Sequence, residues 1–103
     1  MKLATSFILA ISLALQACAI NPVSGKRDFA IVSEPDEIKQ GRQYHKSIIS
    51  RYGVYDDLQL QQYVSRIGQD LAAKSHRSHL DFKFTVLDSP EINAFALPGG
   101  YIY

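Results

Sequence analysis

The protein has 103 residues, so its length allows one domain at most. Its 11 Lys and Arg residues nearly balance its 10 Asp and Glu residues, and the basic residues do not cluster, so we expect no nucleic-acid partner. The chain has 1 Cys, which excludes an intramolecular disulfide.

Residues 1–17 have the pattern of a secretory signal peptide. After Met1 and Lys2, the chain is almost wholly apolar from Leu3 to Leu15. This run is shorter than the roughly 20 residues that a membrane-spanning helix needs, and its position is typical of the apolar region of a signal peptide. A buried core helix is the alternative, although an apolar run directly after Met-Lys seldom packs inside a domain.

The sequence LQAC at Leu15 to Cys18 resembles a bacterial lipobox, in which a small residue precedes the lipidated Cys. Gln16 departs from the usual Ser, Ala or Thr. We therefore predict cleavage before Cys18 and lipidation of its thiol, which would anchor the protein to a membrane. A free thiol beside an ordinary cleavage site is the alternative. Ala19 resembles the residue of outer-membrane lipoproteins, so we expect the bacterial envelope, at the outer membrane facing the periplasm.

Two segments follow the predicted cleavage site. Residues 18–32 contain the turn signals Asn-Pro and Ser-Gly, so we expect a lipid-anchored, extended tether there. Residues 33–103 form the predicted domain.

The domain is expected to begin with an amphipathic helix from Ser33 to Gly53. Acidic residues in its first turn complement the helix dipole, and Gly53 is a typical helix stop. The expected apolar stripe is Ile38, Tyr44, Ile48 and Ile49, with Gly41 allowing a close approach.

A second helix is predicted from Asp56, as its N-terminal cap, to about Lys74. Its apolar residues recur at the spacing of one helix face. They are Leu60, Tyr63, Val64, Ile67 and Leu71.

Three strands are expected after the helices. Leu80 to Asp88 alternates apolar and polar residues, Ile92 to Leu97 reads as a second strand, and Tyr101 to Tyr103 begins a third after the Pro-Gly-Gly turn. The predicted fold is therefore α+β, with two amphipathic helices followed by a short β-hairpin or small sheet. We expect the last strand to be an exposed apolar edge that aggregates readily.

Few residues suggest chemistry directly. His45 is expected on the flank of the first helix, near a neighbour's edge. His76 and His79 lie three residues apart in a polar linker, but no Cys or acidic cluster nearby completes a zinc site. The residues alone therefore indicate no catalytic group and no metal site.

Two motifs together resemble one protein family. INPVSGKRDFAIVSEPDEIKQGRQ, followed by INAFALPGGYIY, is similar to the exported branch of the HtpX and CAAX-prenyl-protease-like zinc metallopeptidases. The resemblance covers essentially the whole chain after the signal peptide. It implies the N-terminal part of a zincin-like metallopeptidase domain.

The resemblance also implies functional expectations. Such enzymes hold zinc through H-E-x-x-H on a helix after the Pro-Gly-Gly turn, and this sequence contains no such motif, so neither bound zinc nor proteolysis is expected of the chain as given. A strand lining the substrate cleft is implied, where polypeptide substrates pair with the backbone. Its residues are Asn93, Ala94, Phe95, Pro98, Gly99 and Gly100.

Two hypotheses remain open. The chain is the N-terminal portion of an envelope zinc metalloendopeptidase that degrades misfolded envelope proteins. Alternatively, it is a complete small outer-membrane lipoprotein that serves as a binding or assembly module. A plain hairpin is an equally good interpretation of Asn93 to Gly100, and it is compatible with substrate binding.

Overall fold

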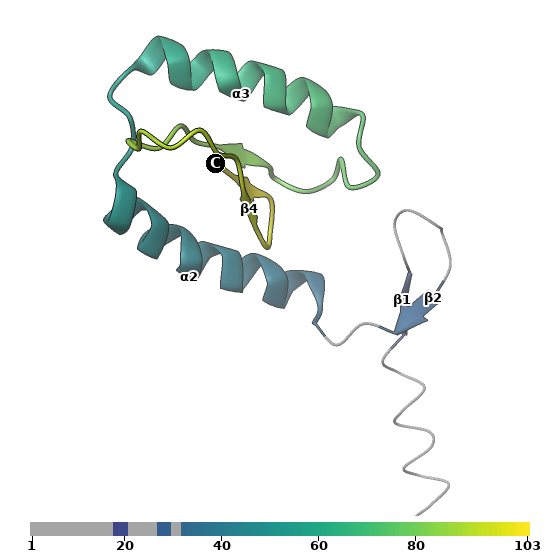
Figure 1. Ribbon diagram of the computed structural model, residues 1–103. Helices are drawn as coiled ribbons and strands as arrows, with labels where there is room; N and C mark the ends of the chain where they lie inside the picture. The colour runs from purple at the N-terminus through teal and green to yellow at the C-terminus, as the bar shows by residue number, and fades with distance from the viewer. Residues whose placement is uncertain (1–17, 21–26, 30–31) are drawn as a thin grey trace, which may run out of the picture. The chain divides into compact units, whose positions relative to one another are not determined.

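The structure is a computed structural model that describes residues 18–20, 27–29 and 32–103 (Figure 1). Residues 1–33 and 34–103 form two separate units. The predicted signal peptide lies outside the described residues. No helix in the described part of the chain is both long and apolar enough to cross a bilayer.

The first unit contains two short paired strands. Strand β1 (Cys18–Ile20) runs antiparallel to β2 (Arg27–Phe29), with Cys18 opposite Phe29. Both strands lie within the segment predicted to be a tether.

The second unit begins with helix α2 (Glu34–Tyr52), which confirms the first predicted helix. Negatively charged side chains occupy its first turn, where the N-terminal helix dipole stabilises them. The helix ends at Gly53, whose φ of 74° favours glycine and whose N–H donates to the Ile49 carbonyl at 2.9 Å.

Helix α3 (Leu58–Ala73) confirms the second predicted helix but corrects its cap. Asp57, rather than Asp56, is the N-terminal cap. The Asp57 Oδ1 atom accepts the Leu60 N–H at 2.9 Å, and the extended backbone at Asp57 aims the carboxylate at the first turn. The sequence does not show which of the two adjacent Asp residues caps the helix. The extended backbone at Asp57 makes it the cap.

Three strands of two residues each complete an α+β fold, as predicted. They are β3 (Lys83–Phe84), β4 (Ala96–Leu97) and β5 (Tyr101–Ile102). Their order is β3-β5-β4, with β5 parallel to β3 and antiparallel to β4. The expectation that the last strand is an exposed edge is therefore wrong. Strand β5 is central because residues 83–85 pair with its other side, and Tyr101 is only 6% exposed.

The first predicted strand, Leu80 to Asp88, is shorter than expected because other groups take its backbone hydrogen bonds after Thr85. Gln61 of α3 binds Val86 with both ends of its amide: its Oε1 accepts the Val86 N–H, and its Nε2 donates to the Val86 carbonyl, each at 2.9 Å. The Tyr55 N–H also donates to that carbonyl. These bonds replace a strand ladder after Thr85. Ile92 is fully exposed, so its predicted contribution to a buried strand is also wrong.

The two helices cover opposite faces of the sheet. Tyr101 of β5 and Phe84 of β3 stand one register position apart, so their side chains point to opposite faces. The Tyr101 ring stacks on His45 of α2, with 4.8 Å between ring centroids, while the Phe84 ring lies against Gly68 of α3. The strands accordingly lie between α3 and α2 in Figure 1.

The predicted apolar stripes are only partly buried. On α3, Leu60 and Val64 are half-buried, and Gly68 continues their row. The remaining members of the predicted stripe are exposed, namely Tyr63, Ile67 and Leu71. Tyr44 of α2 is exposed as well. Strands of two residues offer a narrow surface, and it covers one row of each helix.

Candidate functional site

Strand β4, at the edge of the sheet, is the centre of the candidate site. Phe95 and Tyr103 exchange two backbone hydrogen bonds, of 3.1 and 2.9 Å, so Phe95 and Leu97 direct their backbone groups toward β5. The N–H and C=O groups of Ala96 between them therefore point away from the sheet. Among the described residues, none bonds to Ala96 on that side. An extended peptide can therefore pair there.

The residues assigned to the cleft strand from the sequence lie together around β4. Asn93, Ala94 and Phe95 lead into the strand, and Pro98, Gly99 and Gly100 form the turn to β5. The Asn93 Oδ1 atom accepts the N–H of Ala94, the next residue, at 2.8 Å.

The Pro-Gly-Gly turn is fitted closely against α2. Gly99 and Gly100 have φ values of 83° and 90°, which side-chain-bearing residues rarely adopt. A Cβ atom on Gly41 would lie 1.8 Å from the Pro98 carbonyl oxygen, and one on Gly99 would lie 2.8 Å from the Ile38 Cα atom. The predicted close approach at Gly41 is thus confirmed, and its partner is the turn that carries β4.

A carboxylate of α2 also holds the turn. Glu37 Oε1 accepts the Gly99 N–H at 3.0 Å, and both Glu37 oxygens accept from the Arg77 guanidinium at 3.1 and 3.0 Å. The hydrogen bonds from Arg77 and, to a smaller extent, from the Gly99 N–H lower the pKa of Glu37. Arg77 in turn has a raised pKa, mainly through Glu37. The Glu37 carboxylate therefore both positions the turn through Gly99 and pairs with the positive charge of Arg77.

The ion-pair network extends to the histidine linker. Arg77 also bonds to Glu34 at 3.2 Å, and His79 Nε2 lies 2.9 and 3.0 Å from the two Glu34 oxygens. The bond with His79, followed by Arg77, lowers the pKa of Glu34. In residues 32–103, no group of three or more His, Cys, Asp or Glu side chains is placed to hold a metal ion. Of the two linker histidines, His79 contacts Glu34 through its Nε2 atom.

His45 connects α2 to the end of the chain. Its Nδ1 atom lies 2.6 Å from the Tyr103 hydroxyl, and its ring stacks on Tyr101 and Tyr103. The helix-flank interpretation of His45 is confirmed, and the neighbour is the central strand. Burial, followed by the charge of Tyr101, raises the pKa of Tyr103.

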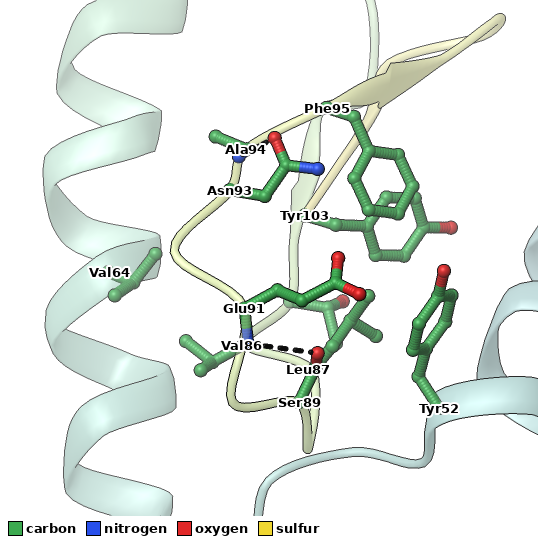
Figure 2. Close-up of a pocket in the computed structure, with 11 residues that line it drawn as sticks. Tyr52, Val64, Val86, Leu87, Ser89, Glu91, Asn93, Ala94, Phe95 and Tyr103 are labelled. Carbon is green, nitrogen blue, oxygen red and sulfur yellow. Dashed lines mark hydrogen bonds between the residues drawn. The ribbon is translucent and has the colours of Figure 1, made fainter.

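A pocket of about 340 Å³ adjoins the chain before β4 (Figure 2). We call it the Glu91 pocket, after its one carboxylate. Helix α2 contributes Tyr52, helix α3 contributes Val64, and the other walls come from the segment before β4 and from the end of β5. The complete lining is Tyr52, Val64, Thr85, Val86, Leu87, Ser89, Glu91, Asn93, Ala94, Phe95 and Tyr103.

Sequence reasoning missed Glu37, Arg77 and the Glu91 pocket. Glu37 is four residues before Gly41, so the spacing Glu-x-x-x-Gly within the family-like motif was the available signal. Arg77 lies in a polar linker with no pattern around it. The pocket combines four separate segments, and no local sequence signal predicts it.

Comparison with known proteins gives two findings. Residues 58–103 match Peptidase family M48, a range that contains α3 and the whole sheet. Over 87 residues, the chain is 34% identical to the mitochondrial metalloendopeptidase OMA1 of Schizosaccharomyces pombe. That similarity covers 80% of this chain and 25% of the relative, so the chain spans about a quarter of the length of the curated relative it matches.

Proposed function

Because the chain belongs to peptidase family M48, we propose that residues 34–103 are the peptide-binding part of a zinc metalloendopeptidase. One observation carries the proposal: β4 is an edge strand whose Ala96 backbone groups point outward, and two independent contacts fix its turn. An extended polypeptide bound there would gain main-chain hydrogen bonds while its side chains alternate between the two sides of the added strand.

The described residues do not themselves fit a zinc ion. His45 pairs with Tyr103 and His79 with Glu34, and no third ligand stands beside either histidine within residues 32–103. This part of the molecule therefore contributes peptide binding and orientation to the reaction. Zinc would activate water in the M48 enzyme.

We further propose that the substrates are misfolded or misassembled proteins of the bacterial envelope. Backbone pairing at an edge strand requires an extended segment, and unfolded chains supply such segments. The apolar run at Leu3 to Leu15, the lipobox at Cys18 and Ala19 support an enzyme anchored by lipid at the outer membrane, facing the periplasm.

The test is cleavage of an unfolded polypeptide by the complete metalloendopeptidase that, under this proposal, contains the chain, isolated from its native membrane. We expect cleavage that a zinc chelator abolishes. The Ala96→Pro variant should lose most of it, because proline removes the outward N–H and is tolerated at a sheet edge. The matched Ala96→Ser variant keeps the N–H and should cleave normally.

Two outcomes would contradict this proposal. Equal cleavage by the Pro and Ser variants would show that peptides do not pair with β4. Peptide binding without chelator-sensitive cleavage would favour a binding or assembly module. The membrane anchor is tested separately by radiolabelled palmitate, whose incorporation should disappear in the Cys18→Ser variant and would refute lipidation if it persisted.

A further inference from the structure

We propose that the Glu91 pocket receives one basic side chain, Arg or Lys, of an extended peptide bound along β4. The inference rests on the proposed function and adds a preference for part of the substrate. The pocket volume of about 340 Å³ lies within the range of about 300–1,000 Å³ that small-ligand pockets occupy. Its walls and its one charge indicate the chemistry of the occupant.

The walls are aromatic on one side. The rings of Tyr52 and Phe95 are 6.5 Å apart between centroids, and those of Phe95 and Tyr103 are 5.0 Å apart. Aromatic faces attract guanidinium and ammonium groups, and they also cover the apolar stem of a long basic side chain. The surface of this protein already shows such a contact, because the Arg51 guanidinium lies 5.3 Å from the centre of the Tyr52 ring.

The single acidic side chain of the pocket pairs with no cation among the described residues. The backbone N–H of Glu91 donates to Ser89 Oγ at 3.3 Å, but among the described residues its side chain has neither an ion pair nor a hydrogen bond. Figure 2 shows the Glu91 side chain reaching toward the side of the pocket where Tyr52 and Tyr103 lie. In the part of the chain that the structure describes, no Lys, Arg or His lines the pocket. Charge complementarity therefore favours a cationic occupant over a neutral or acidic one.

The pocket is continuous with the proposed peptide-binding edge. Asn93, Ala94 and Phe95 line it and lead directly into β4. A strand advances about 3.3 Å per residue, so a peptide paired with Ala96 passes the pocket within about two or three residues. Every second side chain of that peptide points to the same side, so one of them can enter the pocket.

The test measures binding of short peptides to the full chain in detergent micelles by fluorescence anisotropy. The peptides are Ala-Ala-X-Ala-Ala with a fluorophore, where X is Arg, Lys, norleucine or Glu. We expect Arg and Lys to bind more tightly than norleucine, and Glu to bind most weakly. Glu91 is exposed. The Glu91→Gln variant should therefore weaken binding of the Arg peptide by up to about fivefold, the upper end for an exposed ion pair, and should leave the norleucine peptide unchanged.

Two further variants complete the test. Asp88→Asn removes the same charge from the same loop, but Asp88 does not line the pocket, so binding of the Arg peptide should not change. Arg51→Gln removes the neighbouring guanidinium that competes for Tyr52, so binding of the Arg peptide should stay equal or become tighter.

Three results would overturn the inference. They are equal affinities for the Arg and norleucine peptides, equal losses in the Glu91→Gln and Asp88→Asn variants, and no saturable binding of any peptide because another segment or a second copy fills the pocket. Chelator-sensitive cleavage by the full-length protein would stand in all three cases. Conversely, selective binding of the Arg peptide without any cleavage would refute the proposed protease and leave the pocket assignment intact.

Discussion

Helices α2 and α3 both approach the sheet through a glycine, yet the two contacts differ in kind. Gly41 of α2 faces a backbone carbonyl, that of Pro98, whereas Gly68 of α3 faces the ring of Phe84. A side chain can shift away, but a carbonyl in a tight turn moves only if the turn moves. The contrast indicates that α2 fixes the position of β4, while α3 supports the sheet from the other face with more tolerance.

The largest expected effect is at Gly41. The Gly41→Ala variant places a Cβ atom 1.8 Å from the Pro98 oxygen, so either the turn is displaced or the domain does not fold. Alanine favours the helix by about 1 kcal/mol, but the clash should outweigh this gain and lower the free energy of unfolding by about 3 kcal/mol. Urea denaturation measures the change. The exposed Gln43→Ala variant of the same helix is the control, and equal stability of both variants would show that α2 does not fix the turn.

A smaller loss is expected at Gly68. The added methyl group of Gly68→Ala would lie 2.4 Å from ring atoms of Phe84, and a shift of the whole Phe84 side chain should limit the loss to about 1–2 kcal/mol by the same measurement. Adding Phe84→Leu should recover part of that loss, because leucine leaves room for the methyl group. If the double variant loses more free energy of unfolding than the two single variants lose together, the Phe84 ring is not the obstacle.

The ion-pair network is a second difference between the two helices, because Glu37 of α2 binds both the turn and Arg77. Glu37→Gln keeps an acceptor for the Gly99 N–H but removes the charge facing Arg77. The side chains are 26% and 33% exposed, so solvent screening should limit the loss to about 1 kcal/mol. Asp70→Asn, in the exposed pair with Lys74, should change stability by less than about 0.5 kcal/mol. Equal effects of the two variants would mean that the negative charge of Glu37 contributes no more than that of an exposed ion pair.

The same network predicts how stability depends on acid. The pKa values of Glu34 and Glu37 are lowered in the folded protein, so their contribution is complete above the ordinary value of 4.5 and is lost as the pH falls through the lowered values. The Glu34→Gln, Glu37→Gln double variant should therefore lose less stability than the wild type below pH 4.5. Parallel curves of stability against pH for the two proteins would contradict the assignment.

An effect similar in size to that at Glu37 is expected at Tyr103. Tyr103→Phe removes the hydroxyl that contacts His45 Nδ1 and should cost about 0.5–1.5 kcal/mol, whereas Tyr55→Phe, at an exposed ring, should cost less. The raised pKa of Tyr103 means that its contribution is complete below the ordinary value of 10.0 and is lost as the pH rises through the folded value. Ultraviolet absorbance of tyrosinate should show one late-titrating tyrosine that Tyr103→Phe removes.

Much of the candidate site followed from local sequence. The Pro-Gly-Gly turn and the glycine at position 41 were predictable because positive φ values and close approaches leave few alternatives to glycine. The role of Glu37 was not predictable in the same way. Its partners Gly99 and Arg77 lie 62 and 40 residues away, and an acidic residue in a first helical turn already has a sufficient local explanation.

Local sequence was sufficient to predict the two helices, the hairpin and the α+β class, because capping, periodicity and turn residues act over a few positions. Long-range packing, in contrast, places β5 at the centre of the sheet, lets Gln61 take the backbone bonds of Val86 beyond β3, and leaves Tyr63 and Ile67 exposed. Each of these depends on which distant segment lies beside which strand. Whether a strand edge is paired or exposed depends on the segments beside it, and local sequence does not specify those segments.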